Sequence, residues 1–400
     1  MTMRIAYVCA DPGIPVFGCK GCSIHVQEVI RALLQQGHQV ELFAMRWGGE
    51  PPADFAAVPC HTLPTLPRAV SQAAIEPRQT GQRELTLLSL NLELRLALEQ
   101  AEPFDAVYER YSLWSFTGME YARSHGIPGV LEVNAPLIQE QATHRGLVHR
   151  ESAEAVAQRV FRAAHVIVAV SQGVANYLKH YRETQGKVQV IPNGVNPDRF
   201  TKPQIPTQPS DDFTIGFVGT MKPWHGLPTL VEAFVQFYDE FPRTRLLIVG
   251  DGPERAGLEA DLLDRNIHTA VQFTGKVAPT EIPGLLASMQ VAVAPYPDYP
   301  DFYFSPLKVY EYMAAGLPVV ASRIGEIQTL IQSDVNGLLY EPGNQGQLAQ
   351  QFAELYQSPS LRLQLGQRAR ATVLREHTWE RVAQQIVGFM QQTVSTLEVA

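Results

Sequence analysis

The residues best suited to chemistry lie in one short stretch, Phe304–Ser322 (FSPLKVYEYMAAGLPVVAS). Ser305, Lys308 and Glu311 fall on or beside the first turn of a predicted helix. Unpaired N–H groups and the positive end of the helix dipole attract an anion at such a position. A carboxylate at Glu311, near a bound phosphate, is suited to accept hydrogen bonds from a ribose. The stretch therefore predicts a pocket for a nucleoside diphosphate.

The spacing of apolar residues indicates how this stretch folds. Apolar side chains recur at helical spacing from Leu307 to Ala314, and a continuous apolar run follows over Leu317–Ala321. Gly316 and Pro318 end the helix, because glycine accepts a left-handed conformation and proline cannot continue a helix. A helix that leads into a buried strand indicates an α/β domain.

A second candidate is Phe217–Gly226 (FVGTMKPWHG), which joins a predicted strand to a helix. Gly219 would let the backbone approach a phosphate, and Lys222 and His225 supply positive or hydrogen-bond-donating groups. An ordinary strand-to-helix turn with a solvated lysine is the alternative. We favour the phosphate-binding interpretation, because Glu311 is predicted on another loop of the same face.

Weaker candidates follow other predicted strands. Val249–Pro253 and Phe273–Val277 carry glycines, as many ordinary turns do, although the second could present backbone groups to a base. In the first half of the chain, Gly18–His25 places glycines and a histidine at the start of a helix. Leu131–Leu137 ends a strand with Asn134, which could equally serve as a helix cap.

Composition limits the class of protein. The chain has 400 residues, 45% of them hydrophobic and 18% charged, which indicates a globular protein of two domains. Its net charge of −8 disfavours a nucleic-acid partner. No secretory leader or membrane-spanning apolar run is recognised, so we expect a cytoplasmic protein. Cys19 and Cys22 have redox or zinc half-site spacing, but no second pair with ligand spacing follows, so we favour an ordinary loop.

The order of predicted elements indicates two doubly wound α/β domains with ligands at the carboxyl ends of their sheets. We expect an N-terminal domain over residues 1–195, a proline-rich linker over 196–212 and a C-terminal domain over 213–378. An amphipathic helix over 379–400 would cross back to the first domain. Strands of the first domain are predicted at Arg4–Ala10, Val40–Ala44, Ala106–Tyr108, Gly129–Val133, Val166–Val170 and Val188–Ile191. Strands of the second are predicted at Thr214–Val218, Arg245–Val249, Val271–Thr274, Val291–Ala294, Val319–Ala321 and Gly337–Tyr340.

The segment Glu84–Gln100 is predicted as one helix rich in leucine. Its leucines are dense enough to leave part of an apolar face exposed. Packing against the core is the favoured explanation, and an interfacial membrane helix is the alternative. Residues 1–200 carry a net charge of only −1, from 18 basic and 19 acidic residues, so this half suits contact with an anionic membrane better than the other.

Four stretches together resemble the GT-B glycosyltransferases of family 4: Gly18–His25 with the helix that follows, Ile191–Val195 (IPNGV), Phe217–Gly226 and Ser305–Ser322. They occur in the family's order over nearly the whole chain. The resemblance implies two Rossmann-like domains facing a cleft, a nucleotide-sugar donor held mainly by the second and an acceptor held by the first. It also implies transfer with retention at the anomeric carbon, without metal or cofactor, because positive side chains and helix ends neutralise the departing diphosphate.

The resemblance assigns roles to single residues. Gly219, Lys222 and His225 fall in the phosphate loop, Glu311 is the second motif glutamate, which binds ribose, and Gly18 belongs to the glycine loop of the first domain. The expected catalytic residues are Lys222, His225 and Asn134. The expected donor-binding residues are Gly18, Gly21, Gly219, Thr220, Gly250, Lys276, Val277, Ser305, Pro306, Leu307, Lys308 and Glu311.

Four positions depart from the family's common pattern. Tyr303 stands in place of its first glutamate, Thr220 and His225 in place of the arginine and lysine of the phosphate loop, and Asn134 in place of a histidine at a strand end. In the variant of the family with KPWHG and SPLKVYEYMAAG motifs, Lys222 and Lys308 can restore the missing charge.

The expected activity is retaining transfer of a hexose from a nucleotide-diphosphate sugar, with UDP favoured over GDP. The acceptor stays open between a soluble sugar, a glycolipid and a polysaccharide precursor. The opening segment, residues 11–29, is similar to photosynthetic-bacterial members that extend galactolipids, of the digalactosyldiacylglycerol synthase type. Peripheral contact with the inner face of a membrane is compatible with that acceptor. A catalytically silent nucleotide-sugar-binding protein and a GT-B epimerase are the alternatives.

Overall fold

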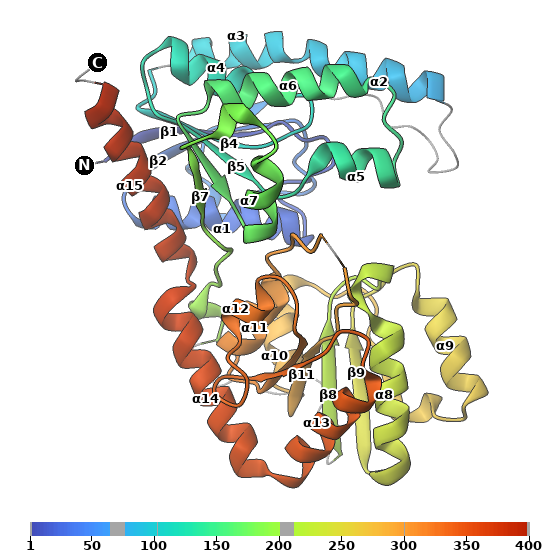
Figure 1. The fold of residues 1–400 in the computed structure, drawn as a ribbon. Helices are drawn as coiled ribbons and strands as arrows, with labels where there is room; N and C mark the ends of the chain where they lie inside the picture. The colour runs from blue at the N-terminus through green and yellow to red at the C-terminus, as the bar shows by residue number, and fades with distance from the viewer. Residues whose placement is uncertain (1, 65–76, 102, 201–211, 300, 398–400) are drawn as a thin grey trace. The chain divides into compact units, whose positions relative to one another are not determined.

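The computed structural model describes residues 2–64, 77–101, 103–200, 212–299 and 301–397 and forms two compact α/β units (Figure 1). The first unit comprises Met1–Pro192 and Trp379–Ala400, and the second comprises Asn193–Thr378. Each unit has a parallel sheet with helices on its faces, which confirms the predicted fold class.

The first unit contains a seven-stranded sheet in the order β3-β2-β1-β4-β5-β6-β7, with every pair parallel. The order reverses between β1 and β4, and ligands of doubly wound sheets bind beside such a point. Its strands are β1 (Arg4–Cys9), β2 (Gln39–Ala44), β3 (Cys60–Thr62), β4 (Ala106–Arg110), β5 (Gly129–Val133), β6 (Val166–Ala169) and β7 (Val188–Val190). Strand β3 was not predicted, because a three-residue edge strand with a polar sequence carries no apolar pattern.

Helices cover this sheet, and the last helix of the chain packs on the first. The ring of Trp379 lies edge-on to His25 with centroids 4.9 Å apart, and Gln36 Nε2 donates to the carbonyl of Glu380 at 2.9 Å. The helices of the unit are α1 (Gly21–Gln35), α2 (Pro77–Ser89), α3 (Asn91–Ala101), α4 (Thr117–Ser124), α5 (Leu137–His144), α6 (Arg150–Ala163), α7 (Gln172–Leu178) and α15 (Trp379–Leu397), with 3₁₀ turns η1 (Ala53–Phe55) and η2 (Arg182–Thr184).

The prediction of one helix over Glu84–Gln100 was wrong, since α2 ends at Ser89 and α3 begins at Asn91. The Asn91 side chain accepts from the N–H groups of Phe116 and Thr117 and donates to the carbonyl of Trp114. These bonds tie the helix start to the loop after β4 and interrupt the helix. The predicted partly exposed apolar face is present: Leu85, Leu92 and Leu96 are 45%, 64% and 44% exposed.

The second unit contains a six-stranded parallel sheet in the order β10-β9-β8-β11-β12-β13. Two clusters of buried apolar side chains fill its faces, and the order reverses between β8 and β11. Its strands are β8 (Phe213–Val218), β9 (Thr244–Val249), β10 (Val271–Phe273), β11 (Val291–Ala294), β12 (Val319–Ser322) and β13 (Leu338–Tyr340). Its helices are α8 (Leu227–Glu240), α9 (Arg255–Asp264), α10 (Ile282–Leu286), α11 (Leu307–Ala314), α12 (Ile327–Leu330), α13 (Gln345–Gln357) and α14 (Pro359–Glu376), with 3₁₀ turns η3 (Pro197–Phe200), η4 (Pro223–His225), η5 (His268–Ala270) and η6 (Pro279–Glu281).

The start of the predicted linker belongs to the second unit. Pro197–Phe200 forms the turn η3, and the Phe200 ring is buried in the core of that unit. The N–H of Val195, placed by the sequence in the first domain, donates to the carbonyl of His377 at 2.9 Å. One buried phenylalanine in a proline-rich segment gives no periodicity, so the sequence could not show this. The rest of the predicted linker, residues 201–211, lies outside the described residues.

Candidate functional site

The loop that follows β8 is bonded to the loop that follows β9. The N–H of Gly219 donates to the carbonyl of Val249 at 2.9 Å, and the N–H of Met221 donates to the carbonyl of Asp251 at 3.1 Å. The loop after β10 joins them, because Thr274 Oγ1 accepts from the N–H of Gly250 at 3.3 Å. Three sequence candidates therefore meet at the carboxyl edge of one sheet, where doubly wound folds bind ligands.

Glycines allow these loops to pack backbone to backbone. A Cβ atom on Gly250 would lie 2.1 Å from the carbonyl oxygen of Gly219, and one on Gly252 would lie 2.3 Å from that of Met221. Gly250 and Gly219 also have left-handed φ angles of 131° and 152°. Loop packing thus explains Gly250, and its predicted contact with the donor stays a prediction. Beside these loops, Lys276 is exposed and Val277 is half-buried against the core.

Lys308, in the first turn of α11, directs its amine toward this loop. Its Nζ atom lies 4.1 Å from the centroid of the Phe217 ring and 5.3 Å from that of Tyr296. A Cβ atom on Gly219 would lie 2.7 Å from the same Nζ. Although the residue as a whole is half-buried, Nζ is inaccessible to solvent and has no hydrogen-bond partner among the described residues. Burial lowers the pKa of Lys308 to about 7.

His225 was expected to supply a positive or hydrogen-bond-donating group, and in the structure its ring is neutral. Its Nδ1 is hydrogen-bonded to the carbonyl of Thr220, and since a carbonyl only accepts, Nδ1 carries the proton. Burial, with the positive charges of Lys308 and Lys222, lowers the pKa of His225 to about 3. The ring is therefore neutral at pH 7, and its Nε2 atom is an acceptor. Lys222 is half-buried, with Nζ 5.5 Å from the ring centroid of Trp224.

Some main-chain N–H groups of the loop after β8 already donate hydrogen bonds within the protein. The N–H of Gly219, expected to face a phosphate, donates to the carbonyl of Val249. None of the residues that the structure describes accepts from the N–H of Thr220, and Thr220 is an exposed residue. Thr220 is therefore the better main-chain donor for an anion at this loop.

Glu311, the predicted ribose ligand, forms an ion pair with Arg199. The two side chains are 20% and 22% exposed, and Arg199 Nη2 also donates to the carbonyl of Pro279 at 2.9 Å. The sequence analysis did not single out Arg199, because it lies in the segment predicted as linker. Its one sequence signal is its position beside the apolar Phe200.

Ser305 is bonded to the IPNGV segment. Its Oγ accepts from the N–H of Asn193 at 3.0 Å, and its carbonyl accepts from Asn193 Nδ2 at 2.9 Å. Asn193 was not predicted as a site residue, and it fixes the turn from which α11 begins. Pro306 is the N-cap residue of α11 and Leu307 its first residue, so both lie next to Lys308.

In the first unit, the predicted residue Asn134 belongs to a cluster around Glu132, near the end of β5. Glu132 accepts from His25 Nε2 at 2.8 Å, Arg110 Nη1 at 3.0 Å and Asn134 Nδ2 at 2.5 Å, and also from the hydroxyl of Tyr108. Burial alone would raise the pKa of this carboxyl, but the bonds and charges of His25, Arg110 and Asn134 lower it to about 2. Asn134 caps no helix and instead holds Glu132.

The glycine loop before α1 is folded on itself. The N–H of Gly18 donates to the carbonyl of Pro15 at 2.8 Å, and the carbonyl of Gly18 accepts from Gln27 Nε2 at 3.0 Å. A Cβ atom on Gly18 would lie 2.9 Å from the Pro15 ring. Gly21 is the first residue of α1. Local packing accounts for Gly18, and a donor contact of either glycine stays a prediction.

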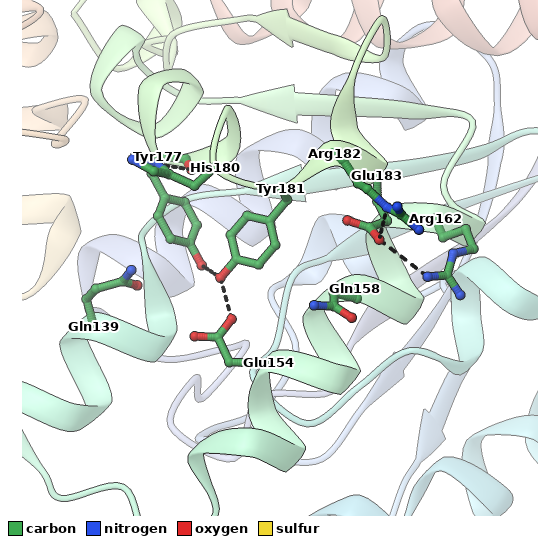
Figure 2. Close-up of a pocket in the computed structure, with 9 residues that line it drawn as sticks. All are labelled: Gln139, Glu154, Gln158, Arg162, Tyr177, His180, Tyr181, Arg182 and Glu183. Atoms are coloured by element: carbon green, nitrogen blue, oxygen red, sulfur yellow. Dashed lines mark hydrogen bonds and ion pairs between the residues drawn. The ribbon is translucent and has the colours of Figure 1, made fainter.

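A cavity of about 590 Å³ in the first unit contains none of the predicted site residues. Figure 2 shows that its tyrosines and charged groups bond to one another. The hydroxyl of Tyr181 donates to Glu154 at 2.9 Å, and Arg162 lies 3.3 Å from Glu183. Its lining residues are Gln139, Glu154, Gln158, Arg162, Tyr177, His180, Tyr181, Arg182 and Glu183. Because these charges are already paired, we place the candidate site in the second unit, at Lys308.

Within the described ranges, no group of three or more His, Cys, Asp or Glu side chains is suited to a metal ion. Cys9, Cys19, Cys22 and Cys60 are all free thiols. None of the described helices is both long and apolar enough to cross a membrane.

Two Rossmann-like units, each with a parallel sheet, are typical of the GT-B class. In the second unit, loops converge at the carboxyl edge of the sheet. Known proteins of similar structure agree. Sucrose-phosphate synthase from Thermosynechococcus elongatus superposes with a TM-score of 0.74 at 21% identity, over 98% of this chain and 100% of that one. Anabaena HepE, in complex with UDP and glucose, superposes with a TM-score of 0.68 at 21% identity, over 97% and 99%.

Sequence comparison gives the family. The model of Glycosyltransferase Family 4 matches residues 20–199, and that of Glycosyl transferases group 1 matches residues 212–358. The D-inositol 3-phosphate glycosyltransferase of Acidothermus cellulolyticus is 24% identical over 98% of this chain and 88% of its own length. The chain belongs to the GT-B glycosyltransferases of the group 1 and family 4 superfamily.

Proposed function

We propose that this glycosyltransferase transfers a hexose from a UDP-hexose to an acceptor hydroxyl, with retention at the anomeric carbon and without a metal ion. The observation that carries the proposal is that Lys222 and Thr220, whose N–H has no acceptor among the described residues, lie on the glycine-containing loop after β8. Positive and hydrogen-bond-donating groups at a glycine-rich strand end suit a diphosphate. The UDP complex of the similar Anabaena structure supports UDP as the nucleotide.

The leaving diphosphate is where these residues act. When the bond between the anomeric carbon and the phosphate oxygen breaks, negative charge grows on that oxygen. Lys222 and the N–H of Thr220 stabilise the charge, and preorganised electrostatic stabilisation of this kind is usually the largest catalytic contribution. The acceptor hydroxyl attacks from the face that the diphosphate leaves and gives its proton to the departing phosphate oxygen. This route requires no side-chain nucleophile.

Glu311 positions the nucleoside in this proposal. Its carboxylate accepts hydrogen bonds from the ribose hydroxyls, while the ion pair with Arg199 fixes the direction of the carboxylate. Both side chains are about a fifth exposed, so a ligand can reach the carboxylate without unfolding the turn η3.

The acceptor follows from weaker observations. The names of two similar proteins, D-inositol 3-phosphate glycosyltransferase and sucrose-phosphate synthase, favour a phosphorylated polyol or sugar. A galactolipid acceptor, of the digalactosyldiacylglycerol synthase type, is supported by the exposed leucines of the two consecutive helices α2 and α3, since exposed apolar side chains suit a membrane surface. Co-sedimentation with galactolipid and anionic vesicles separates the two, because only the lipid version requires binding.

The decisive test of the activity combines ligand binding with one substitution. Specific binding of a UDP-hexose raises the unfolding temperature by mass action. We expect Lys222→Ala to lower turnover by about a hundredfold or more, the size reported for loss of one stabilising donor in other enzymes, while the unfolding temperature is kept. The exposed Lys179→Ala, in the first unit, is the control and should keep full turnover. Normal turnover in Lys222→Ala, or no thermal shift with any UDP- or GDP-hexose, would overturn the proposal.

A further inference from the structure

We propose that Lys308 is a binding cation for the donor's diphosphate, reached through the space left by Gly219, and that it takes up a proton when the diphosphate binds. This inference rests on the proposed function and adds to it a residue outside the loop, on α11. It predicts a dependence of donor binding on pH that the loop residues alone would not give.

The first observation that supports the proposal is that Lys308 Nζ has no hydrogen-bond partner among the described residues. An ammonium group carries three hydrogen-bond donors, and a buried ionised group without a partner is strongly unfavourable. The Nζ atom of Lys308 is closed to solvent and bonds to none of the described residues. Such a group weakens the fold in the free protein. A ligand that supplies the missing anion explains its presence.

The second support is the path from Nζ to the loop. Gly219 has no side chain, and a Cβ atom there would come within 2.7 Å of Nζ. Gly219 therefore lies next to the amine, and it directly precedes the exposed residue Thr220 in the chain. A side chain at this position would fill the space beside the amine and would also have to adopt a left-handed φ angle.

The third support is the chemistry of the walls. The ring faces of Phe217 and Tyr296 hold the amine at centroid distances of 4.1 Å and 5.3 Å, and ring faces attract a cation without neutralising it. Aromatic walls also exclude water, so an anion that enters meets a cation of little hydration. The electrostatic attraction between the two is stronger in such a place than in water.

The charged and titratable groups around Lys308 leave room for an anion. From the loop after β8, His225 is neutral and Lys222 is positive. Tyr296, which follows β11, and Tyr312, on α11, have hydroxyl pKa values raised by burial, so both hydroxyls are uncharged. Glu311, one turn further along α11, forms its ion pair with Arg199. The local charge is therefore positive and increases when Lys308 is protonated.

The sign of the pH dependence follows from these groups. Burial lowers the pKa of Lys308 to about 7, so in the free protein a large share of the amine is neutral at pH 8. A bound diphosphate favours the charged form and raises that pKa, because an opposite charge nearby stabilises the ammonium. Binding above pH 7 must therefore take up a proton at Nζ. The affinity falls as pH rises, by up to about tenfold per pH unit for one coupled proton.

Calorimetric titration with UDP and with inorganic pyrophosphate, between pH 7.5 and 9, tests the inference on the full chain. Titration in buffers of different ionisation enthalpy measures proton uptake directly. We expect uptake and falling affinity with pH in the wild-type protein. Lys308→Met should lose at least about tenfold in affinity for both ligands at pH 7.5 and should show no pH slope. Lys222→Met also removes one positive charge but should keep the slope, so it is the matched control.

The stability of Lys308→Met separates loss of the site from loss of the fold. An apolar side chain of similar length replaces a buried charge without a partner, so the unfolding temperature should stay the same or rise. If this variant did not fold, Lys308→Arg, which is charged at every pH of the test, should bind UDP without a pH slope. An absence of proton uptake in the wild type counts against the inference without any variant.

Each outcome bears on a different claim. Equal affinity and equal slope in Lys308→Met and the wild type would overturn the role of Lys308 while leaving the proposed function in place. Binding without proton uptake in the wild type would do the same. A wild-type protein that binds neither UDP, GDP nor pyrophosphate would overturn both the inference and the proposed function.

Discussion

Each unit buries a charged side chain near the carboxyl edge of its sheet, and the two side chains differ in their hydrogen bonding. In the first unit, Glu132 accepts hydrogen bonds from four side chains. In the second, Lys308 has none among the described residues. Both side chains lose water on folding, yet only the carboxylate regains equivalent bonds from the protein. A satisfied buried charge supports the fold, whereas an unsatisfied one indicates a place for a ligand.

The pKa values express the same difference. Bonds and neighbouring charges outweigh burial at Glu132 and lower its pKa to about 2, so it stays ionised at any physiological pH. At Lys308 burial acts alone and lowers the pKa to about 7, so its charge is easily lost. The hydroxyl of Tyr7, which lies near Glu132 and has no hydrogen-bond partner among the described residues, is the exception beside the cluster around Glu132. A neutral hydroxyl costs far less than an unpaired ion.

The largest effect is expected when the satisfied cluster is broken. Glu132→Gln removes the negative charge and leaves the buried guanidinium of Arg110 without its anion. Loss of one partner of a buried pair costs about 3–5 kcal/mol, so the first unit should become unstable. The free energy of unfolding, followed by denaturant titration with a signal from that unit, measures it. As control, Glu99→Gln breaks the half-exposed pair with Arg95 and should change the free energy by less than about 0.5 kcal/mol.

Acid titration checks the same cluster without a substitution. The pKa of Glu132 is lowered from 4.5 to about 2 in the folded protein, so its stabilisation is complete above pH 4.5 and is lost as pH falls toward 2. The wild-type first unit should lose stability in this window. In Glu132→Gln that part of the pH dependence should be absent. Equal acid profiles in the two proteins would contradict the assignment.

An intermediate effect is expected at the loops of the second unit. Gly252→Ala would place a Cβ atom 2.3 Å from the carbonyl of Met221, and backbone must move to admit it. Such overpacking costs about 1–3 kcal/mol, and the shift of the loop should weaken UDP binding about tenfold or more. Gly257→Ala, in α9, has open space around the new methyl group and should stabilise the protein by about 0.5–1 kcal/mol. Calorimetry and thermal unfolding of both variants give the comparison.

The fold could be predicted from the sequence because apolar patterns mark its buried strands. In the second unit all six strands were predicted within two residues of their observed bounds, from Phe213–Val218 to Leu338–Tyr340. The predictions failed where hydrogen bonds of polar groups determine the structure. Asn91 divides a leucine-rich helix by bonding to a loop 25 residues further on, and β3 pairs through its backbone at the sheet edge. Neither leaves a pattern in the local sequence.

The sequence indicates which loops meet at the candidate site, but it reveals little about the bonding of single atoms there. Motif spacing placed Gly219 and Lys308 on separate segments, and the structure brings them together. The sequence could not show that the N–H of Gly219 is already bonded, that His225 is neutral, or that Arg199 pairs with Glu311. Each depends on burial and on partners far along the chain, which a sequence without homologues does not reveal.

The smallest effect on stability is expected at Asn134, a residue that the sequence predicted to be catalytic. In the structure Asn134 Nδ2 donates to Glu132 at 2.5 Å and the side chain is half-buried, so water can replace the amide once it is removed. Asn134→Ala should therefore cost about 1 kcal/mol of stability, with less than a tenfold loss of turnover. Asn134→Asp places a second carboxylate beside Glu132 and should destabilise more, because like charges repel. If turnover in Asn134→Ala fell a hundredfold while stability held, the amide would act on the reacting groups, and the cluster around Glu132 would be part of the active site and not only of the fold.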